Sequence, residues 1–107
     1  VSWFQETPEL SLELIKRFAP SKESSLIDVG GGASRLIDQL LLSGYKNPTV
    51  LDISEHGLNH SKERLGEKKY QVQWVVQDIR NLKSGAAYDL WHDRALFHFL
   101  NSIYYLI

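Results

Sequence analysis

The feature that most constrains the fold is a short apolar segment followed directly by three glycines. Residues 25–29, Ser-Leu-Ile-Asp-Val, have the length and composition of a buried β-strand, and Gly30, Gly31 and Gly32 come next. Apolar residues then recur at helical spacing, at Leu36, Ile37, Leu40 and Leu41. A strand that enters a helix through glycines is typical of folds that hold a nucleotide-like ligand, because glycine lets the backbone approach it closely.

The remaining periodicities alternate between helix and strand. We predict helices from Pro8 to the residues before Pro20, from Leu36 to Gly44, over residues 55–65 after a Ser54 cap, and over 95–105. We predict strands over 25–29, 49–53, 72–76 and 88–93. In the first helix, Leu10, Leu14 and Phe18 are expected to share one apolar face, and Ile15 is expected to lie beside them. Right-handed crossovers between such strands give a parallel sheet in a doubly wound α/β fold.

Composition limits the classes of partner. The 107 residues predict one domain over 1–107, and 12 Lys and Arg against 13 Asp and Glu give a net charge of −1, so no nucleic acid partner is expected. The absence of Cys excludes disulfides and thiolate metal sites. No apolar run approaches the roughly 20 residues that cross a bilayer, and no signal peptide is visible, so a cytoplasmic protein is expected.

The glycines leave three interpretations open. A dinucleotide loop, G-x-G-x-x-G, needs a third glycine where Arg35 stands. A second kind of ligand-binding loop has an acidic residue followed by small residues at alternate positions. Asp28, Gly30, Gly32 and Ser34 fit this pattern better. A plain tight turn also uses glycines.

Two further carboxylates end predicted strands. Asp52 lies about 20 residues after Gly30, where an acidic side chain can bind both ribose hydroxyls. Asp78 follows the third strand, where a carboxylate can accept a hydrogen bond from the amine of an adenine and Ile79 can flank the ring. The alternatives are a helix cap or solvated loop for Asp52, although Ser54 is the better cap, and a simple turn for Asp78.

Four segments in this order resemble the class I S-adenosylmethionine (SAM)-dependent methyltransferases over roughly residues 8–100. They are Leu26-Ile-Asp-Val-Gly-Gly-Gly-Ala-Ser34, Thr49-Val-Leu-Asp-Ile-Ser54, Val76-Gln-Asp-Ile-Arg80 and Tyr88-Asp-Leu-Trp-His-Asp-Arg94. The segment over residues 91–98 is particularly similar to small bacterial members and to related protein-lysine methyltransferases. The resemblance implies a Rossmann-like sheet, here with strand order 3-2-1-4, and SAM as the cofactor.

The resemblance also implies roles for individual residues. The glycine loop would contact the methionine part of SAM, Asp28 its ammonium end, Asp52 the ribose, and Asp78 with Ile79 the adenine. The expected cofactor-binding residues are therefore Asp28, Gly30, Gly31, Gly32, Ser34, Asp52, Ile53, Asp78 and Ile79.

The end of the fourth strand would face the transferred methyl group. Positioning supplies most of the catalysis of methyl transfer, and a base is needed only if the acceptor arrives protonated. Asp93 and His92 are the candidates for that base. Asp93 could instead cap a helix near Ala95, and His92 could be a hydrogen-bonded residue at the strand end. His56 and His60 share a helix face but lack a third ligand, so no metal site is expected.

A complete family domain has seven strands, whereas this sequence supplies four and ends in the apolar Ile103-Tyr-Tyr-Leu-Ile107. It is expected to be either a fragment or a naturally short relative. An unpaired fourth strand recruits partners, so we expect either a homodimer through that edge and the apolar tail or a chain of poor stability. The methyl acceptor, a small molecule or a protein, is not specified. The alternative function is a non-catalytic module that binds SAM or a partner protein.

Overall fold

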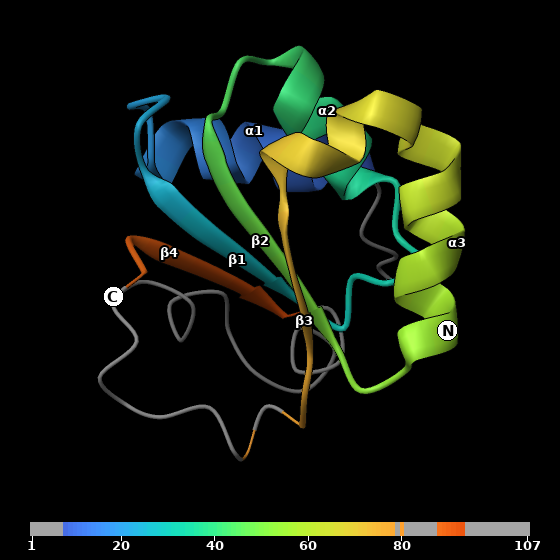
Figure 1. The fold of residues 1–107 in the computed structure, drawn as a ribbon. Helices are drawn as coiled ribbons and strands as arrows, with labels where there is room; N and C mark the ends of the chain where they lie inside the picture. The colour runs from blue at the N-terminus through green and yellow to red at the C-terminus, as the bar shows by residue number, and fades with distance from the viewer. Residues whose placement is uncertain (1–7, 79, 81–87, 94–107) are drawn as a thin grey trace, which may run out of the picture.

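The computed structural model describes residues 8–78, 80 and 88–93 (Figure 1). In chain order the elements are α1 (Pro8–Phe18), β1 (Ser25–Val29), α2 (Leu36–Leu42), β2 (Asn47–Asp52), α3 (Glu55–Leu65), the 3-10 helix η1 (Gly66–Gln71), β3 (Gln73–Val76) and β4 (Leu90–Asp93). The helix predicted over 95–105 lies outside the described residues. None of the helices described is long and apolar enough to cross a membrane.

The four strands form one parallel sheet in the order β3-β2-β1-β4, which confirms the predicted Rossmann-like arrangement. Val29 at the end of β1 lies opposite Leu51 of β2 and Asp93 of β4, and Asp52 lies opposite Val76 of β3. The carboxyl ends of all four strands therefore meet at one end of the sheet, where open α/β sheets bind their ligands.

The sheet has two unlike faces. The main core unites all three helices with one face of the sheet, through residues such as Ile15, Leu36, Val50 and Leu58. In Figure 1, α1 and α2 lie behind the sheet and α3 lies beside β3. The opposite face carries a second cluster of Ile27, Val29 and Leu51, because side chains alternate between faces along each strand.

The ends of α3 follow the local sequence. The Ser54 hydroxyl accepts a hydrogen bond from the Gly57 N–H at 3.2 Å, so Ser54 is the N-cap of α3, as predicted. Gly66 ends the helix with φ of +62°. The 3-10 helix that follows was not predicted, because its sequence, Gly-Glu-Lys-Lys-Tyr-Gln, has no apolar period. The Trp74 indole N–H donates to the Lys69 carbonyl at 2.9 Å and holds this turn against β3.

The predicted inner face of α1 was wrong by about one residue. Phe18 is 49% exposed, whereas Ser11 and Ile15 are buried, at 0% and 2% exposed. The apolar pattern missed this rotation because Ser11 is a polar residue on the buried side. Its hydroxyl lies 3.2 Å from Nε2 of His92, so a hydrogen bond inside the protein replaces the one to water.

Candidate functional site

A cavity of about 200 Å³ lies at the carboxyl ends of the strands. It is lined by Val29, Gly30, Leu51, Asp52, Ile53, Gln77, Asp78 and Asp93. Five of these residues were candidates from the sequence, namely Gly30, Asp52, Ile53, Asp78 and Asp93. Val29, Leu51 and Gln77 were not predicted, although their positions next to predicted site residues in the sequence could have indicated them. Side chains from β1, β2, β4 and the segment after β3 thus converge on one small space.

A larger groove, of about 460 Å³, lies at the opposite end of the sheet. It is lined by Ser25, Lys46, Asn47, Pro48, Thr49, Tyr70, Gln71, Val72, Gln73 and Tyr88, and so contains no carboxylate. The smaller cavity is lined by three Asp residues and by Gly30 of the glycine loop, and it lies at the end where α/β sheets bind ligands. Chemistry and topology, rather than size, therefore select the smaller cavity as the candidate site.

The three glycines of the loop are required for different reasons. Gly30 has φ of +75°, a conformation that favours glycine, and the space that its Cβ would occupy is open. A Cβ on Gly31 would lie 2.3 Å from Oδ2 of Asp28, and one on Gly32 would lie 2.7 Å from Oδ2 of Asp52. The loop therefore packs against the carboxylates of Asp28 and Asp52, and it is open to the cavity at Gly30.

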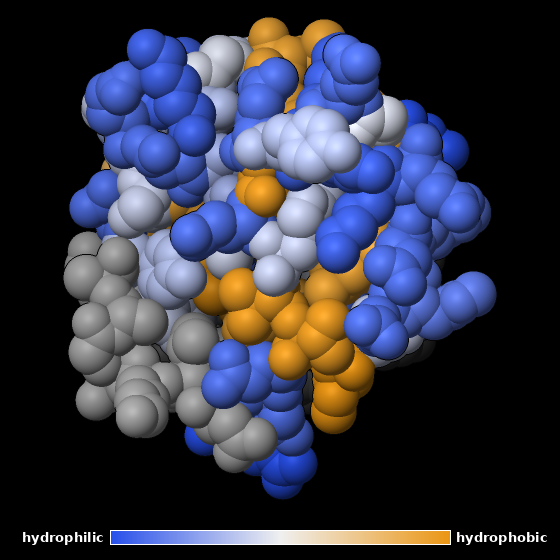
Figure 2. Space-filling model, viewed as in Figure 1, coloured by the Kyte–Doolittle hydropathy of each residue, from blue (hydrophilic) through white to orange (hydrophobic). Residues whose placement is uncertain are grey.

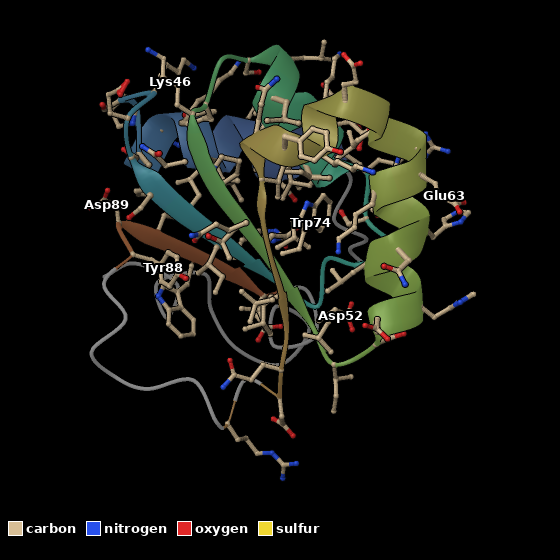
Figure 3. All side chains as sticks on the ribbon, in the orientation of Figure 1. Lys46, Asp52, Glu63, Trp74, Tyr88 and Asp89 are labelled. Atoms are coloured by element: carbon tan, nitrogen blue, oxygen red, sulfur yellow. The ribbon has the colours of Figure 1, made fainter. Side chains whose placement is uncertain are left out.

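Asp52 lies where β2 passes into α3 (Figure 3). One oxygen of its carboxylate accepts a hydrogen bond from the Gly32 N–H at 2.9 Å, and the other accepts one from the Ser54 N–H at 2.9 Å. A carboxylate has about four acceptor positions, so two hydrogen bonds leave room for two more. Asp52 therefore holds the loop in place and can still accept two donors from a ligand.

Asp78 pairs with Arg80, which the sequence analysis did not anticipate. The Arg80 Nη2 lies 2.6 Å from Oδ2 of Asp78, and the Arg80 backbone N–H donates to Oδ1 at 2.9 Å. The hydrogen bonds from Arg80 lower the pKa of Asp78 to about 2. Asp78 therefore presents an ionised carboxylate at the cavity, paired with an exposed guanidinium.

Exposed apolar side chains stand beside the cavity. Ile53 is 70% exposed and Val76 is 50% exposed, and they come from the ends of β2 and β3. Figure 2 shows apolar atoms gathered in the lower middle of this view. Large apolar side chains exposed next to a polar cavity suit a ligand with a flat apolar ring.

His92 and Asp93 point to opposite faces of the sheet, because they are neighbours on β4. Asp93 is 4% exposed and lines the cavity. His92 is 7% exposed, does not line the cavity, and lies between Asp28 and Ser11. The two side chains predicted as catalytic candidates are therefore not brought together.

Helix α3 supports the glycine loop from outside, through residues that the sequence analysis missed. Gly57 packs against Gly32, and the Ser61 hydroxyl donates to the Gly32 carbonyl. Arg64 donates to the Ser34 carbonyl at 3.1 Å and to both carboxylate oxygens of Asp38 in α2. The available signal was the small side chains of Gly57 and Ser61, four residues apart on one helix face, which allow a close approach.

Two other predicted residues have different positions. Ser34 is buried, and its hydroxyl accepts a hydrogen bond from the Leu36 N–H at 3.0 Å at the start of α2. It does not line the cavity. Ile79 lies outside the described residues. Within the part of the chain that is described, no three His, Cys, Asp or Glu side chains are grouped so that they could hold a metal ion.

Known proteins share both the sequence pattern and the fold. Residues 26–104 match a family described as "Methyltransferase domain". The eEF1A lysine and N-terminal methyltransferase of Mus musculus is 31% identical over 81 residues, which are 76% of this chain and 11% of that protein.

Solved structures with the same fold include a putative RNA methyltransferase from Pyrococcus horikoshii, with a TM-score of 0.70, 19% identity, and coverage of 92% of this chain and 52% of that one. A SAM-bound amino pentose methyltransferase from Micromonospora echinaspora has a TM-score of 0.62, 17% identity, and coverage of 87% and 43%. The chain thus spans about half or less of each of these proteins.

The family match extends from the start of β1 past the end of β4 and includes every residue that lines the candidate cavity. It covers well over half of the sequence. The chain belongs to the methyltransferase domain family.

Proposed function

We propose that the chain binds SAM at the carboxyl ends of its strands and forms the cofactor-binding part of a SAM-dependent methyltransferase. The observation that carries the proposal is the cavity that is lined by an open glycine, Gly30, together with carboxylates from the ends of the two strands that flank β1, Asp52 of β2 and Asp93 of β4. The solved amino pentose methyltransferase of the same fold is SAM-bound, which supports SAM as the ligand.

Asp52 is proposed to bind the ribose. Its two remaining acceptor positions match the two neighbouring hydroxyls of a ribose, which are both donors. The two backbone hydrogen bonds fix the carboxylate before the ligand arrives, and such preorganisation lowers the entropy lost on binding.

The adenine is proposed to lie between Ile53 and the segment after β3. The exposed side chain of Ile53 supplies an apolar surface for the ring, and Asp78 supplies an acceptor for its exocyclic amine. Since Arg80 already donates to both oxygens of Asp78, the adenine amine would share this carboxylate with the guanidinium. Ile79 is proposed to flank the ring from the same segment.

The methionine part of SAM is proposed to lie along the glycine loop. Gly30 leaves the backbone open on the cavity side, and Gly31 and Gly32 let the loop settle onto Asp28 and Asp52. One oxygen of Asp28, Oδ2, is buried beneath Gly31 and has no hydrogen-bond partner among the described residues, so we propose that the charge of Asp28 acts on the cationic end of the ligand from below the loop. Ser34 shapes the loop through its bond to Leu36.

SAM, when bound, supplies a methyl group activated by its sulfonium. Asp93 borders the cavity from β4 and is the residue we propose to accept a proton from an acceptor that arrives protonated. The remaining contribution of the chain is to hold the ligand in one orientation, since alignment supplies much of the rate enhancement in such displacements. The acceptor is proposed to be a protein or a small molecule.

Isothermal titration calorimetry with SAM and S-adenosylhomocysteine tests this proposal. We expect Asp52→Asn to weaken binding about tenfold or more, because the amide cannot accept on both sides as the carboxylate does. Asp89→Asn is the matched control, since Asp89 also accepts from a backbone N–H, that of Ser25, but at the opposite end of the sheet (Figure 3). No heat from the unsubstituted chain at high micromolar ligand would refute SAM binding.

Methyl transfer is tested separately, by incubating the chain with isotope-labelled SAM and pools of protein or small-molecule acceptors. Label in the acceptor supports a catalytic role. Binding without transfer to any pool favours the alternative, a SAM-binding module that does not react.

A further inference from the structure

A chain of buried polar side chains lies beneath the glycine loop and joins three elements. His92 of β4 stands between Asp28 of β1 and Ser11 of α1. Its Nδ1 lies 2.9 Å from Oδ1 of Asp28, and its Nε2 lies 3.2 Å from the Ser11 hydroxyl. Asp28 is 2% exposed, His92 is 7% exposed and Ser11 is fully buried, at 0%. Most polar side chains buried to this degree form hydrogen bonds, since an unpaired buried polar atom costs free energy.

The two oxygens of the Asp28 carboxylate have different surroundings. Oδ1 lies next to the imidazole of His92, whereas Oδ2 is buried, has no hydrogen-bond partner among the described residues, and lies under the Cα of Gly31. Since Asp28 and His92 are register partners on neighbouring parallel strands, the sheet itself fixes their separation. The orientation of the carboxylate beneath the loop therefore depends on the bond to His92.

We propose that His92 is a positioning residue for the cofactor loop. Its Nδ1–H holds the Asp28 carboxylate so that Oδ2 lies against Gly31, and the loop takes its open shape on that support. The role of the imidazole is thus exerted through Asp28, on the face of the sheet away from the cavity that Asp93 lines. Its effect on SAM affinity rests on the function proposed above, whereas its effect on loop geometry does not.

The carboxylate of Asp28 determines which ring nitrogen of His92 is the donor. A carboxylate oxygen accepts, so Nδ1 of His92 carries the proton, and in the neutral ring Nε2 accepts from the Ser11 hydroxyl. Two substitutions separate the two contacts. In His92→Asn the amide nitrogen stands where Nδ1 stood and can still donate to Asp28. In His92→Gln the amide group reaches the place of Nε2, towards Ser11, and the donor to Asp28 is lost.

The experiment measures SAM affinity by calorimetry and, without ligand, the amide NMR resonances of Gly30, Gly31 and Gly32. His92→Gln is expected to weaken SAM binding about tenfold or more, the loss typical of one hydrogen bond to a charged group, and to shift the glycine resonances. His92→Asn and Ser11→Ala are expected to stay within about threefold of the unsubstituted chain. Thermal unfolding of each variant separates altered affinity from lost fold.

Equal affinity and unchanged glycine resonances in His92→Gln would overturn the positioning role. If the unsubstituted chain does not bind SAM, the proposed function fails. The glycine resonances of His92→Gln and His92→Asn still decide the role of His92 in that case. The ¹⁵N shifts of the His92 ring need no variant: a protonated Nδ1 supports the inference, and a ring protonated at Nε2 alone contradicts it.

Discussion

At the scale of single residues, a substitution at Gly30 can distinguish the cost of backbone strain from the loss of a ligand contact. It has φ of +75°, and Gly44, in the turn after α2, has φ of +90°. At either position, no atom of the described residues lies within 4 Å of where a Cβ would be, so an Ala there causes backbone strain without a clash with them. The two glycines differ in surroundings, because only Gly30 lines the candidate cavity.

Gly30→Ala and Gly44→Ala are therefore expected to lower the free energy of unfolding by similar amounts, about 1–2 kcal/mol each. Only Gly30→Ala is expected to weaken SAM binding, by about tenfold or more, since its methyl group occupies the open side of the loop. Urea denaturation measures the first effect and calorimetry the second. Equal SAM affinity in the two variants would contradict a ligand-facing Gly30.

Arg80 determines the charge of Asp78 at low pH. The pKa of Asp78 is lowered to about 2, so its carboxylate stays ionised to that pH, and the associated stabilisation is present above the ordinary pKa and lost as the pH falls through about 2. Arg80→Gln removes the guanidinium but keeps the backbone N–H that donates to Asp78, so it is expected to raise the pKa part of the way from about 2 towards the ordinary value for Asp. NMR titration of the Asp78 carboxyl carbon measures the change, and an unchanged midpoint would show that Arg80 is not the cause.

At the scale of elements, α3 and α2 are joined by an ion pair that also reaches the glycine loop. The side chains of Arg64 and Asp38 are 18% and 26% exposed, whereas those of the Lys46–Glu23 pair are 69% and 63% exposed. Exposed pairs contribute little, because water screens them and both side chains lose freedom. The partly buried pair has two hydrogen bonds in a fork geometry.

Double-mutant cycles with Ala compare the two pairs. We expect a coupling free energy of about 1 kcal/mol or more between Arg64 and Asp38, and about 0–0.5 kcal/mol between Lys46 and Glu23. Chemical denaturation of the four proteins in each cycle gives these values. Equal coupling in the two cycles would mean that the Arg64–Asp38 pair stabilises the fold no more than an exposed ion pair does.

At the scale of the whole molecule, the pattern of strands and helices was enough to predict the sheet and its strand order. Apolar period, glycines and caps are local signals, and crossover handedness converts them into a topology. The strand ends then follow, and with them the five candidate residues that line the cavity.

The contacts between distant segments were not predictable in this way. His92 and Ser11 are 81 residues apart in sequence, and Arg64 and Asp38 are 26 apart. Periodicity assigns a residue to a face but does not say which polar side chain of another element lies there. The same reason accounts for α1, where a buried Ser replaced the apolar residue that the pattern required.

The edges of the sheet bear on how copies of the chain associate. Among the described residues, β4 pairs only with β1 and β3 pairs only with β2, so each has one side without a partner strand. An unpaired strand edge presents a row of backbone donors and acceptors that a second chain can bind. Residues next to β3 include the charged Glu67, Lys68 and Lys69 of η1, which disfavour such pairing there.

We therefore expect association through β4, the edge that the sequence indicated. Light scattering over a concentration series is expected to show a molar mass that rises from the monomer towards twice that value. Hydrogen exchange supplies the internal control: the amides of residues 90–93 should gain protection as the concentration rises, while those of residues 73–76 on the opposite edge should not. A monomer mass at every concentration would rule out the dimer, and equal gains at both edges would place the contact elsewhere than β4.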